Sequence, residues 1–209
     1  NVVDTIDKTN SLQPDRLAFY SYAHVPWIKG NGQRGFHDND LPKDHEKRQL
    51  YEKGKQLLAK KGYYEIGMDH FALQNDALFV SAQEGKLHRN FMGYTASKTQ
   101  LMIGLGVSSI SDSWYAFAQN EKTIEAYYEK LDKDELPVFR GHLLNQEDLI
   151  IRKHILNLMC QFQTSWQDKN TYFLEIEQIL PQLSEMEKDG LLNIANQTLT
   201  VTEKGKPFV

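Results

Sequence analysis

The sequence predicts an α/β fold that is followed by a mostly helical region. Three short apolar runs predict buried strands: Leu17–Ala23, Tyr63–Ile66 and Leu101–Val107. Each run ends in polar residues, and helical or loop segments separate the runs, a pattern typical of a parallel sheet with crossover connections. From about Asn120 onward, the apolar residues recur at helical spacing.

Three strands are too few for a closed (β/α) barrel, which needs about eight strand–helix units in roughly 250 residues. Parallel sheets are normally covered on both faces, so three such strands form a poor fold by themselves. We therefore expect residues 1–118 to be the C-terminal portion of a partial barrel. Residues 119–209 are expected to form a helical domain with a small β-hairpin.

Two helices are expected among the strands of the first half. A helix from Lys43 to about Lys61 begins after Pro42 and ends at Gly62, in agreement with the positions that proline and glycine favour. A shorter helix, Asp76–Glu84, ends before Gly85.

The second half predicts helices and then a hairpin, an order that resembles a winged-helix module. Asparagine and early acidic residues mark two helix starts, because both stabilise the positive end of a helix. The expected elements are a helix capped by Asn120, a helix capped by Asn145 with Glu147 and Asp148 in its first turn, helices Thr171–Leu180 and Pro181–Asp189, and a hairpin of Leu191–Ile194 with Leu199–Val201.

Composition and charge argue against several partners. The formal net charge is -4 and the pI is about 6.0, so no global charge favours nucleic acid or an acidic membrane surface. No apolar run approaches the roughly 20 residues of a membrane helix. The single cysteine, Cys160, is expected in the core, and its lack of a disulfide partner in the chain fits a cytoplasmic protein.

Two polar clusters follow apolar segments and supply the catalytic candidates Asp69, His70 and His88. Asp69 and His70 are neighbours, so in a strand their side chains point to opposite faces. The simplest expectation is that one side chain is buried and the other is exposed. Arg89 could bind an anion, since a guanidinium forks onto carboxylates and phosphates, but His88 and Arg89 could equally belong to surface ion pairs. No catalytic signature is complete, and we expect no metal ligand in this chain.

Five stretches together resemble the oxygen-independent coproporphyrinogen III oxidase family: YAHVPW, GYYEIGMDHFA, LHRNFMGYT, GLGVSSIS and LIIRKHILNLMC. The resemblance extends from about Pro14 to Phe208. It implies a partial barrel that holds a [4Fe-4S] cluster on a CxxxCxxC loop, and then a helical C-terminal domain. In this family the cluster cleaves S-adenosyl-L-methionine (SAM), and the resulting radical takes hydrogen from two propionates of coproporphyrinogen III. The propionates lose carbon dioxide and become the vinyl groups of protoporphyrinogen IX.

The resemblance also implies roles for particular residues. Ala23 and Ile110 stand where family members contact SAM, and Met92 stands where many relatives have glutamine. A methionine cannot make the hydrogen bonds of an amide, so any role of that glutamine is in doubt here. The CxxxCxxC loop is absent. This chain is therefore expected to be inactive alone and to need the missing N-terminal half of the barrel, with the full-length enzyme a monomer.

Because the substrate is a tetracarboxylate, cationic residues are its expected contacts. Arg89 is the first candidate, followed by Arg34, Arg140 and Arg152. Two other readings stay open. One is a haem-chaperone relative from the same radical SAM superfamily. The other is a stand-alone winged-helix-like module that binds DNA, although its helices lack a clear basic stripe.

Overall fold

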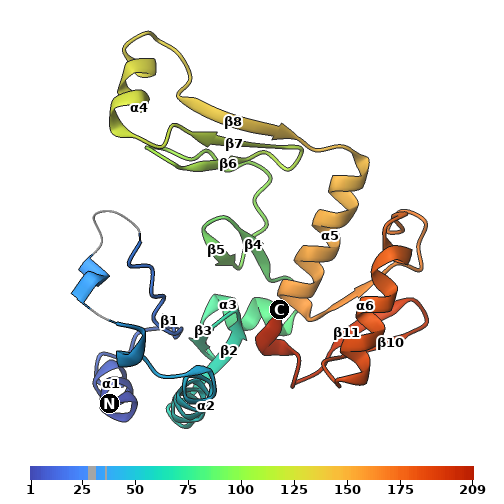
Figure 1. The fold of residues 1–209 in the computed structure, drawn as a ribbon. Helices are drawn as coiled ribbons and strands as arrows, with labels where there is room; N and C mark the ends of the chain where they lie inside the picture. Colours follow the sequence, from blue (N-terminus) through green and yellow to red (C-terminus); the bar gives the residue numbers. More distant parts are fainter. Residues whose placement is uncertain (28–31, 36) are drawn as a thin grey trace. The chain divides into compact units, whose positions relative to one another are not determined.

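The structure is a computed structural model that describes residues 1–27, 32–35 and 37–209, without the side chains of residues 32 and 34. The described residues form two compact units, Asn1–Val80 and Ser81–Val209 (Figure 1). All the strand pairs that they form are antiparallel. The chain is therefore mixed α/β, as predicted, but its sheets are small and locally connected.

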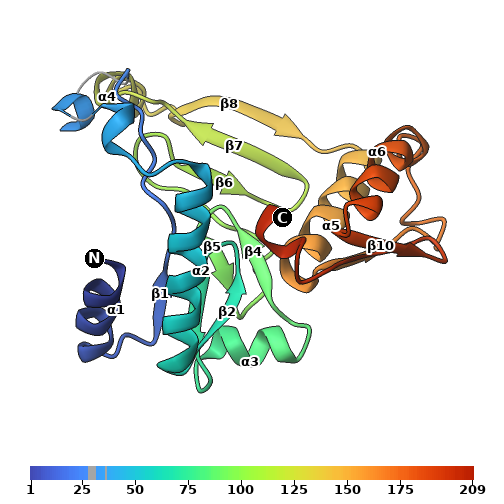
Figure 2. The same cartoon turned by 60° about the horizontal axis from the view of Figure 1, so that its bottom comes forward.

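The first unit packs two helices against a three-stranded sheet of order β1-β3-β2. α1 and α2 lie side by side, and α2 packs against β2 (Figure 2). The core joins all of these elements through Ile6, Leu58, Tyr63 and Phe71. The elements are α1 (Val2–Ser11), β1 (Arg16–Ala18), η1 (Gly32–Gly35), η2 (Asp38–Asp40), α2 (Asp44–Lys60), β2 (Tyr63–Gly67), β3 (His70–Leu73) and α3 (Ala77–Gln83), the last of which runs into the second unit.

The second unit contains a hairpin, a three-stranded sheet of order β6-β7-β8 and a C-terminal group of helices and strands. Its elements are β4 (His88–Asn90), β5 (Gly93–Thr95), β6 (Ile110–Asp112), β7 (Ala116–Asn120), α4 (Ile124–Leu131), β8 (Val138–Leu143), α5 (Gln146–Gln161), β9 (Gln163–Ser165), α6 (Ile176–Lys188), β10 (Leu192–Ala195), β11 (Thr198–Val201) and η3 (Lys206–Phe208).

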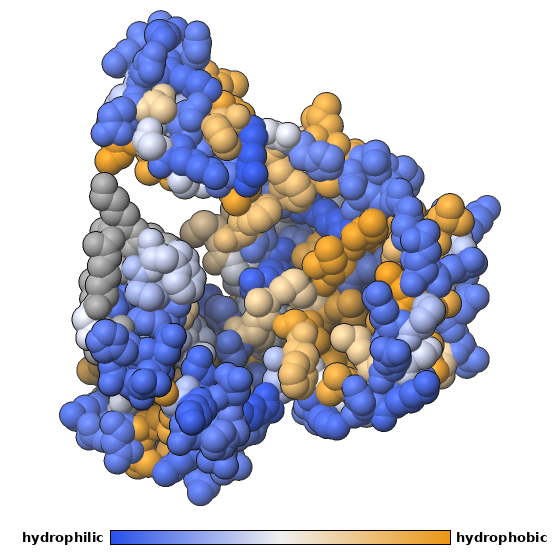
Figure 3. Space-filling view, viewed as in Figure 1, coloured by the Kyte–Doolittle hydropathy of each residue, from blue (hydrophilic) through white to orange (hydrophobic). Residues whose placement is uncertain are grey.

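The C-terminal group has its own core of Trp166, Ile176, Leu192 and Leu199. Asn145 caps α5 as predicted: its side chain accepts a hydrogen bond from the Asp148 backbone N–H at 2.9 Å. Hydrophobic side chains also gather on the surface over α5 and the C-terminal elements (Figure 3).

The C-terminal hairpin is confirmed, and Asn196 and Gln197 form its left-handed turn. The predicted helices Thr171–Leu180 and Pro181–Asp189 are instead one helix, α6, with Pro181 inside it. Strand β9 adds a third strand to the hairpin. The winged-helix description remains a prediction.

The predicted parallel strands are not formed among the described residues. Leu17–Ala23 contributes only the short, largely exposed β1. Met102 is the single residue of Leu101–Val107 that pairs, through one bridge to Asp112. The two polar clusters do not stand at the ends of parallel strands. Met68 and Asp69 form the left-handed turn between β2 and β3, and His70 begins β3. His88, Arg89 and Asn90 form β4, which pairs with β5. Apolar character predicted the segments but not their pairing.

Residues 101–105 lie outside the strands except for the bridge at Met102, and the alternate side chains Leu101, Ile103 and Leu105 are exposed. Asn120, predicted as a helix cap, holds this segment instead: its Nδ2 donates to the carbonyls of Gly104 at 3.1 Å and Gly106 at 2.9 Å. The cap of α4 is Thr123.

The sequence-based division at residues 118 and 119 falls inside β7, whereas the compact units divide at Val80 and Ser81. The division into a barrel portion and a C-terminal domain therefore remains a prediction. In the described part of the chain, no helix has the length and apolarity needed to cross a membrane.

Replacing Asn120 with alanine should lower the free energy of unfolding by about 1–3 kcal/mol, because two carbonyl groups lose their buried donor. Urea denaturation measures the change. The matched control is Asn193→Ala on β10, where the side chain is exposed, and it should change stability little. Equal losses in the two variants would contradict the role of Asn120.

Candidate functional site

A cavity of about 440 Å³ lies within the second unit and is lined by residues of the β4–β5 hairpin, the β6-β7-β8 sheet and α5. We call it the Arg89 cavity. Its walls combine apolar side chains with charged ones of both signs. Its lining residues include Arg89, Phe117, His142, Asp148, Arg152 and Ile155.

Arg89 lines this cavity, and one of its guanidinium nitrogens is left without a partner among the described residues. Its guanidinium carbon lies 5.0 Å from the centre of the Tyr94 ring. Its Nη1 is buried and has no hydrogen-bond partner among the described residues. A buried, unpaired N–H of a charged group is costly, so an anionic partner in the cavity would relieve that cost. His88, the preceding residue, lines a different cavity, as the alternation of side chains along a strand requires.

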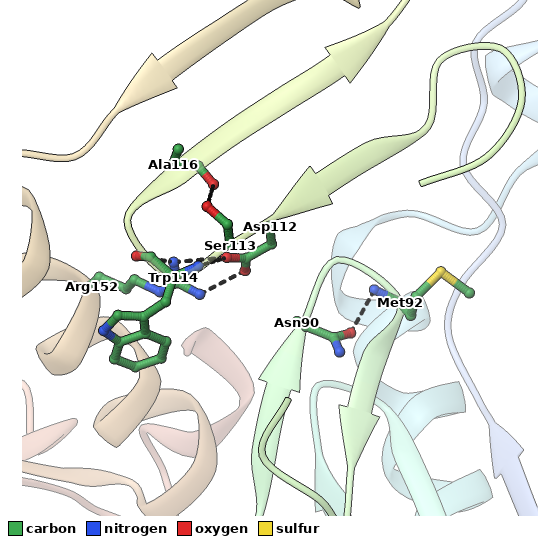
Figure 4. Close-up of polar contacts among 7 residues, drawn as sticks. All are labelled: Asn90, Met92, Asp112, Ser113, Trp114, Ala116 and Arg152. Carbon is green, nitrogen blue, oxygen red and sulfur yellow. Dashed lines mark hydrogen bonds and ion pairs between the residues drawn. The ribbon is translucent and has the colours of Figure 1, made fainter. Parts of the chain in front are cut away.

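Arg152, in contrast, already has an anionic partner. Its guanidinium forks onto Asp112, with Nη1–Oδ1 at 3.0 Å and Nη2–Oδ2 at 2.6 Å, and Nη1 also donates to the Trp114 carbonyl at 2.9 Å (Figure 4). Asp112 is only 7% exposed. The two arginines therefore differ: Arg152 has a carboxylate partner, whereas Arg89 has none among the described residues.

His142 and Asp148 form a pair at the same cavity, with His142 Nε2 3.0 Å from Asp148 Oδ2. The backbone N–H of Asn145 and the imidazole of His142 both lower the pKa of Asp148. This pair did not emerge from sequence reasoning. The available signal was the position of Asp148 in the first turn of α5, three residues after the cap Asn145. That position predicts a carboxylate near the start of the helix but not its partner.

The predicted residues Arg140 and Ile110 line a second cavity, of about 310 Å³. It shares Phe91, Phe117 and His142 with the Arg89 cavity. Arg140 donates from Nε to Gln119 Oε1 at 3.0 Å and is exposed. Met92 lies in the β4–β5 turn, where it is 85% exposed and its backbone N–H is bonded to Asn90 (Figure 4).

The other predicted residues belong to the first unit. The Ala23 carbonyl accepts a hydrogen bond from Gln33 Nε2 at 3.0 Å. Asp69 and His70 are both half-buried, so neither is fully buried or fully exposed. The pKa of Tyr51 is raised by burial and then by Glu65 and Asp69. The side chain of Arg34 lies outside the described residues.

Cys160 is a buried core residue, as predicted, and burial raises the pKa of its thiol to about 11. It is therefore a poor thiolate. Within residues 1–27, 32–35 and 37–209, no cluster of three or more His, Cys, Asp or Glu side chains could hold a metal ion.

No protein-family model matches the chain. Oxygen-independent coproporphyrinogen III oxidase of Synechocystis sp. is 39% identical over 99% of this chain, and the enzyme of the same name from Escherichia coli is 36% identical over 98%. The chain spans 46% of the length of each. The matched share is the C-terminal part.

A solved structure of coproporphyrinogen III oxidase (HemN) from Escherichia coli, described as a radical SAM enzyme, superposes with a TM-score of 0.89 at 36% identity. The match covers 98% of this chain and 48% of that one. The chain thus resembles about half of these relatives, in sequence as well as in fold.

Replacing Asp112 with alanine should lower the free energy of unfolding by about 3–5 kcal/mol, because Arg152 would remain buried without its carboxylate. Equilibrium urea denaturation of the purified chain tests this. The control is Glu129→Ala, which breaks an exposed ion pair with Lys133 and should leave stability essentially unchanged. An Asp112→Ala loss no larger than that of the control would show that the buried pair is not structurally important.

Proposed function

We propose that this chain, a homologue of the C-terminal part of the oxygen-independent coproporphyrinogen III oxidases, performs the corresponding part of their reaction. The whole enzyme would oxidatively decarboxylate two propionates of coproporphyrinogen III to vinyl groups and so make protoporphyrinogen IX for haem. The observation that carries the proposal concerns Arg89, which lines the Arg89 cavity and whose buried Nη1 has no hydrogen-bond partner among the described residues.

Arg89 would bind a propionate carboxylate of the substrate. A guanidinium and a carboxylate form charge-assisted hydrogen bonds, and such bonds contribute about 1.5–3 kcal/mol when one partner is charged. The apolar side chains of Phe117 and Ile155 line the same cavity and would contact the tetrapyrrole ring. Arg140 and Arg34 remain weaker candidates for the other carboxylates, and Arg152 is the least suitable because Asp112 already engages it.

The cofactors would be held mainly by the part of the enzyme that this chain does not span. A [4Fe-4S] cluster takes cysteine thiolates, and the only cysteine here is the buried Cys160. When bound, the cluster with SAM would supply the radical that removes hydrogen from the propionate. On this chain we propose Ala23 and Ile110 as SAM contacts. In support, Ile110 is half-buried and lines a cavity together with Phe91 and Phe117.

The exposed apolar side chains of residues 101–107 support the proposal that this chain needs the N-terminal half of the barrel. Leu101, Ile103 and Leu105 are each more than 60% exposed, at alternate positions of the sequence. Such a face is expected to pair with or pack against further strands. We infer that the missing part of the enzyme covers it and completes the partial barrel.

Three further features are proposed. The enzyme would be cytoplasmic, and the full-length protein would be a monomer. Met92 would not replace the hydrogen bonds of the glutamine that many relatives have. The haem-chaperone and DNA-binding readings have less support, because the relatives at 36–39% identity bear the name of the oxidase.

The proposal is tested on the native protein, isolated with an antibody raised against this chain. Immunoblotting gives its mass, and an anaerobic assay with SAM and coproporphyrinogen III measures protoporphyrinogen IX by fluorescence after oxidation. Formation of that product, dependent on SAM, is the expected result. A native protein of only 209 residues that forms no product would overturn the proposal.

In the native enzyme, Arg89→Ala should raise the KM for coproporphyrinogen III at least about tenfold, since a charge-assisted bond to the substrate is lost. Arg89→Lys should recover part of the affinity, because it keeps the charge but not the fork. Arg48→Ala is the matched control; this arginine of α2 pairs with Glu52 and should not affect KM.

A second measurement separates binding from folding. Because Arg89 has no carboxylate partner among the described residues, Arg89→Met should not lower the free energy of unfolding of the chain. An unchanged KM in Arg89→Ala, or a large loss of stability in Arg89→Met, would contradict the proposed role of Arg89.

A further inference from the structure

A separate cavity of about 610 Å³ in the second unit carries an excess of positive charge. We call it the lysine cavity. Its walls come from the α3–β4 connection, the segment after β5, the β6–β7 turn and α5. Lys86, Lys98 and Lys153 line it, and no aspartate or glutamate stands among its described lining residues. Within a chain of net charge -4, this is a local concentration of cations.

Two of the three lysines have no anionic partner among the described residues. Lys86 pairs with Glu84 at 2.8 Å. Lys98 lies with its Nζ 4.4 Å from the centre of the Trp114 ring and makes no described ion pair, and neither does Lys153. Cations that gather around a concave wall raise the local concentration of anions there.

The aromatic wall of the cavity is held rigidly. Trp114 has a φ of 69°, a left-handed conformation that costs a bulky residue free energy and persists only when its surroundings enforce it. Asp112 accepts a hydrogen bond from the Trp114 backbone N–H at 2.9 Å, and Arg152 donates to its carbonyl at 2.9 Å. The Arg152 guanidinium carbon also lies 4.3 Å from the centre of the ring.

His88 lies within the field of these cations. Its side chain is buried, with 6% of the residue exposed, and lines the lysine cavity. Burial lowers the pKa of His88, and the charges of Lys98 and Arg152 lower it further against the opposing effect of Asp112. Protonating this imidazole therefore becomes easier when an anion enters the cavity.

We propose that the lysine cavity binds a small anion through carboxylate or phosphate groups, with Lys98 and Lys153 as its charge partners and Trp114 as a fixed wall. The site is spatially separate from the proposed substrate contact at Arg89. Its volume of about 610 Å³ favours a small molecule over a nucleic-acid strand, which would need a longer basic surface. Lysine side chains are flexible, so several of them can contact a multivalent anion at different points. A single arginine would instead make one rigid, bidentate contact.

Isothermal titration calorimetry of the 209-residue chain with inorganic phosphate and with citrate tests the proposal and distinguishes the two chemistries. We expect saturable binding of at least one probe, weakened by added sodium chloride. The double variant Lys98→Ala/Lys153→Ala should bind about tenfold more weakly. Because both lysines are exposed, circular dichroism and thermal unfolding should show that this variant folds normally.

Two matched variants set the limits. Lys188→Ala removes an exposed lysine of α6 outside the cavity and should bind as the unmodified chain does. Arg89→Ala should also bind normally, so failure of the substrate proposal would leave this one intact. Saturable binding of neither probe, or equal weakening by Lys188→Ala, would overturn the proposal.

A titration of the His88 imidazole by NMR gives a readout that a merely structural role of the lysines would not produce. In the unmodified chain, the bound probe should raise the pKa of His88, because the anion favours the protonated ring. In the double lysine variant, the same probe concentration should have much less effect. Calorimetry could show binding while the pKa of His88 stays the same with the probe present. That result would place the anion elsewhere and contradict the assignment.

Discussion

The buried ion pair between Asp112 and Arg152 connects the β6-β7-β8 sheet to helix α5. Asp112 ends strand β6, Arg152 projects from α5, and the pair bridges a sequence separation of 40 residues. The same two side chains hold the backbone of Trp114 on both sides. An isolated charge in this position would be expensive, so the pair fixes the β6–β7 turn against the helix. Both cavities depend on that attachment.

Local signals in the sequence predicted local structure well. The start of α5 follows from Asn145 and the acidic residues after it, because capping is an interaction between near neighbours. The C-terminal hairpin was predictable from Asn196, which lies in the turn between its two strands. In the first half, the predicted strand Tyr63–Ile66 is formed as β2, but its pairing is antiparallel. The other two predicted strands are formed only as the short β1 and one isolated bridge. The reason is that an apolar run indicates burial and does not specify the pairing partner. Residues 101–107 illustrate this, since their apolar face is still uncovered.

The sites were predictable only in part, for a related reason. Arg89 and Arg152 were equivalent as arginines, and only the three-dimensional position of Asp112 separates the paired guanidinium from the unpaired one. The helical spacing of α5 also indicates which of its residues share a face and can line one cavity. On α5, residues 152, 155, 156 and 159 line the Arg89 cavity, and residues 153, 156, 157 and 160 line the lysine cavity. Each set repeats at the three- and four-residue steps of one helix face.

Strand β4 presents His88 to one cavity and Arg89 to the other, so a three-residue strand separates two places that attract anions. Negative charges held on opposite sides of so thin a wall repel each other through a medium of low polarity. Occupancy of either cavity would therefore weaken the other by the same factor in both directions, as thermodynamic reciprocity requires. The alternation of a single strand would thus set the two proposed ligands against each other, although they never touch.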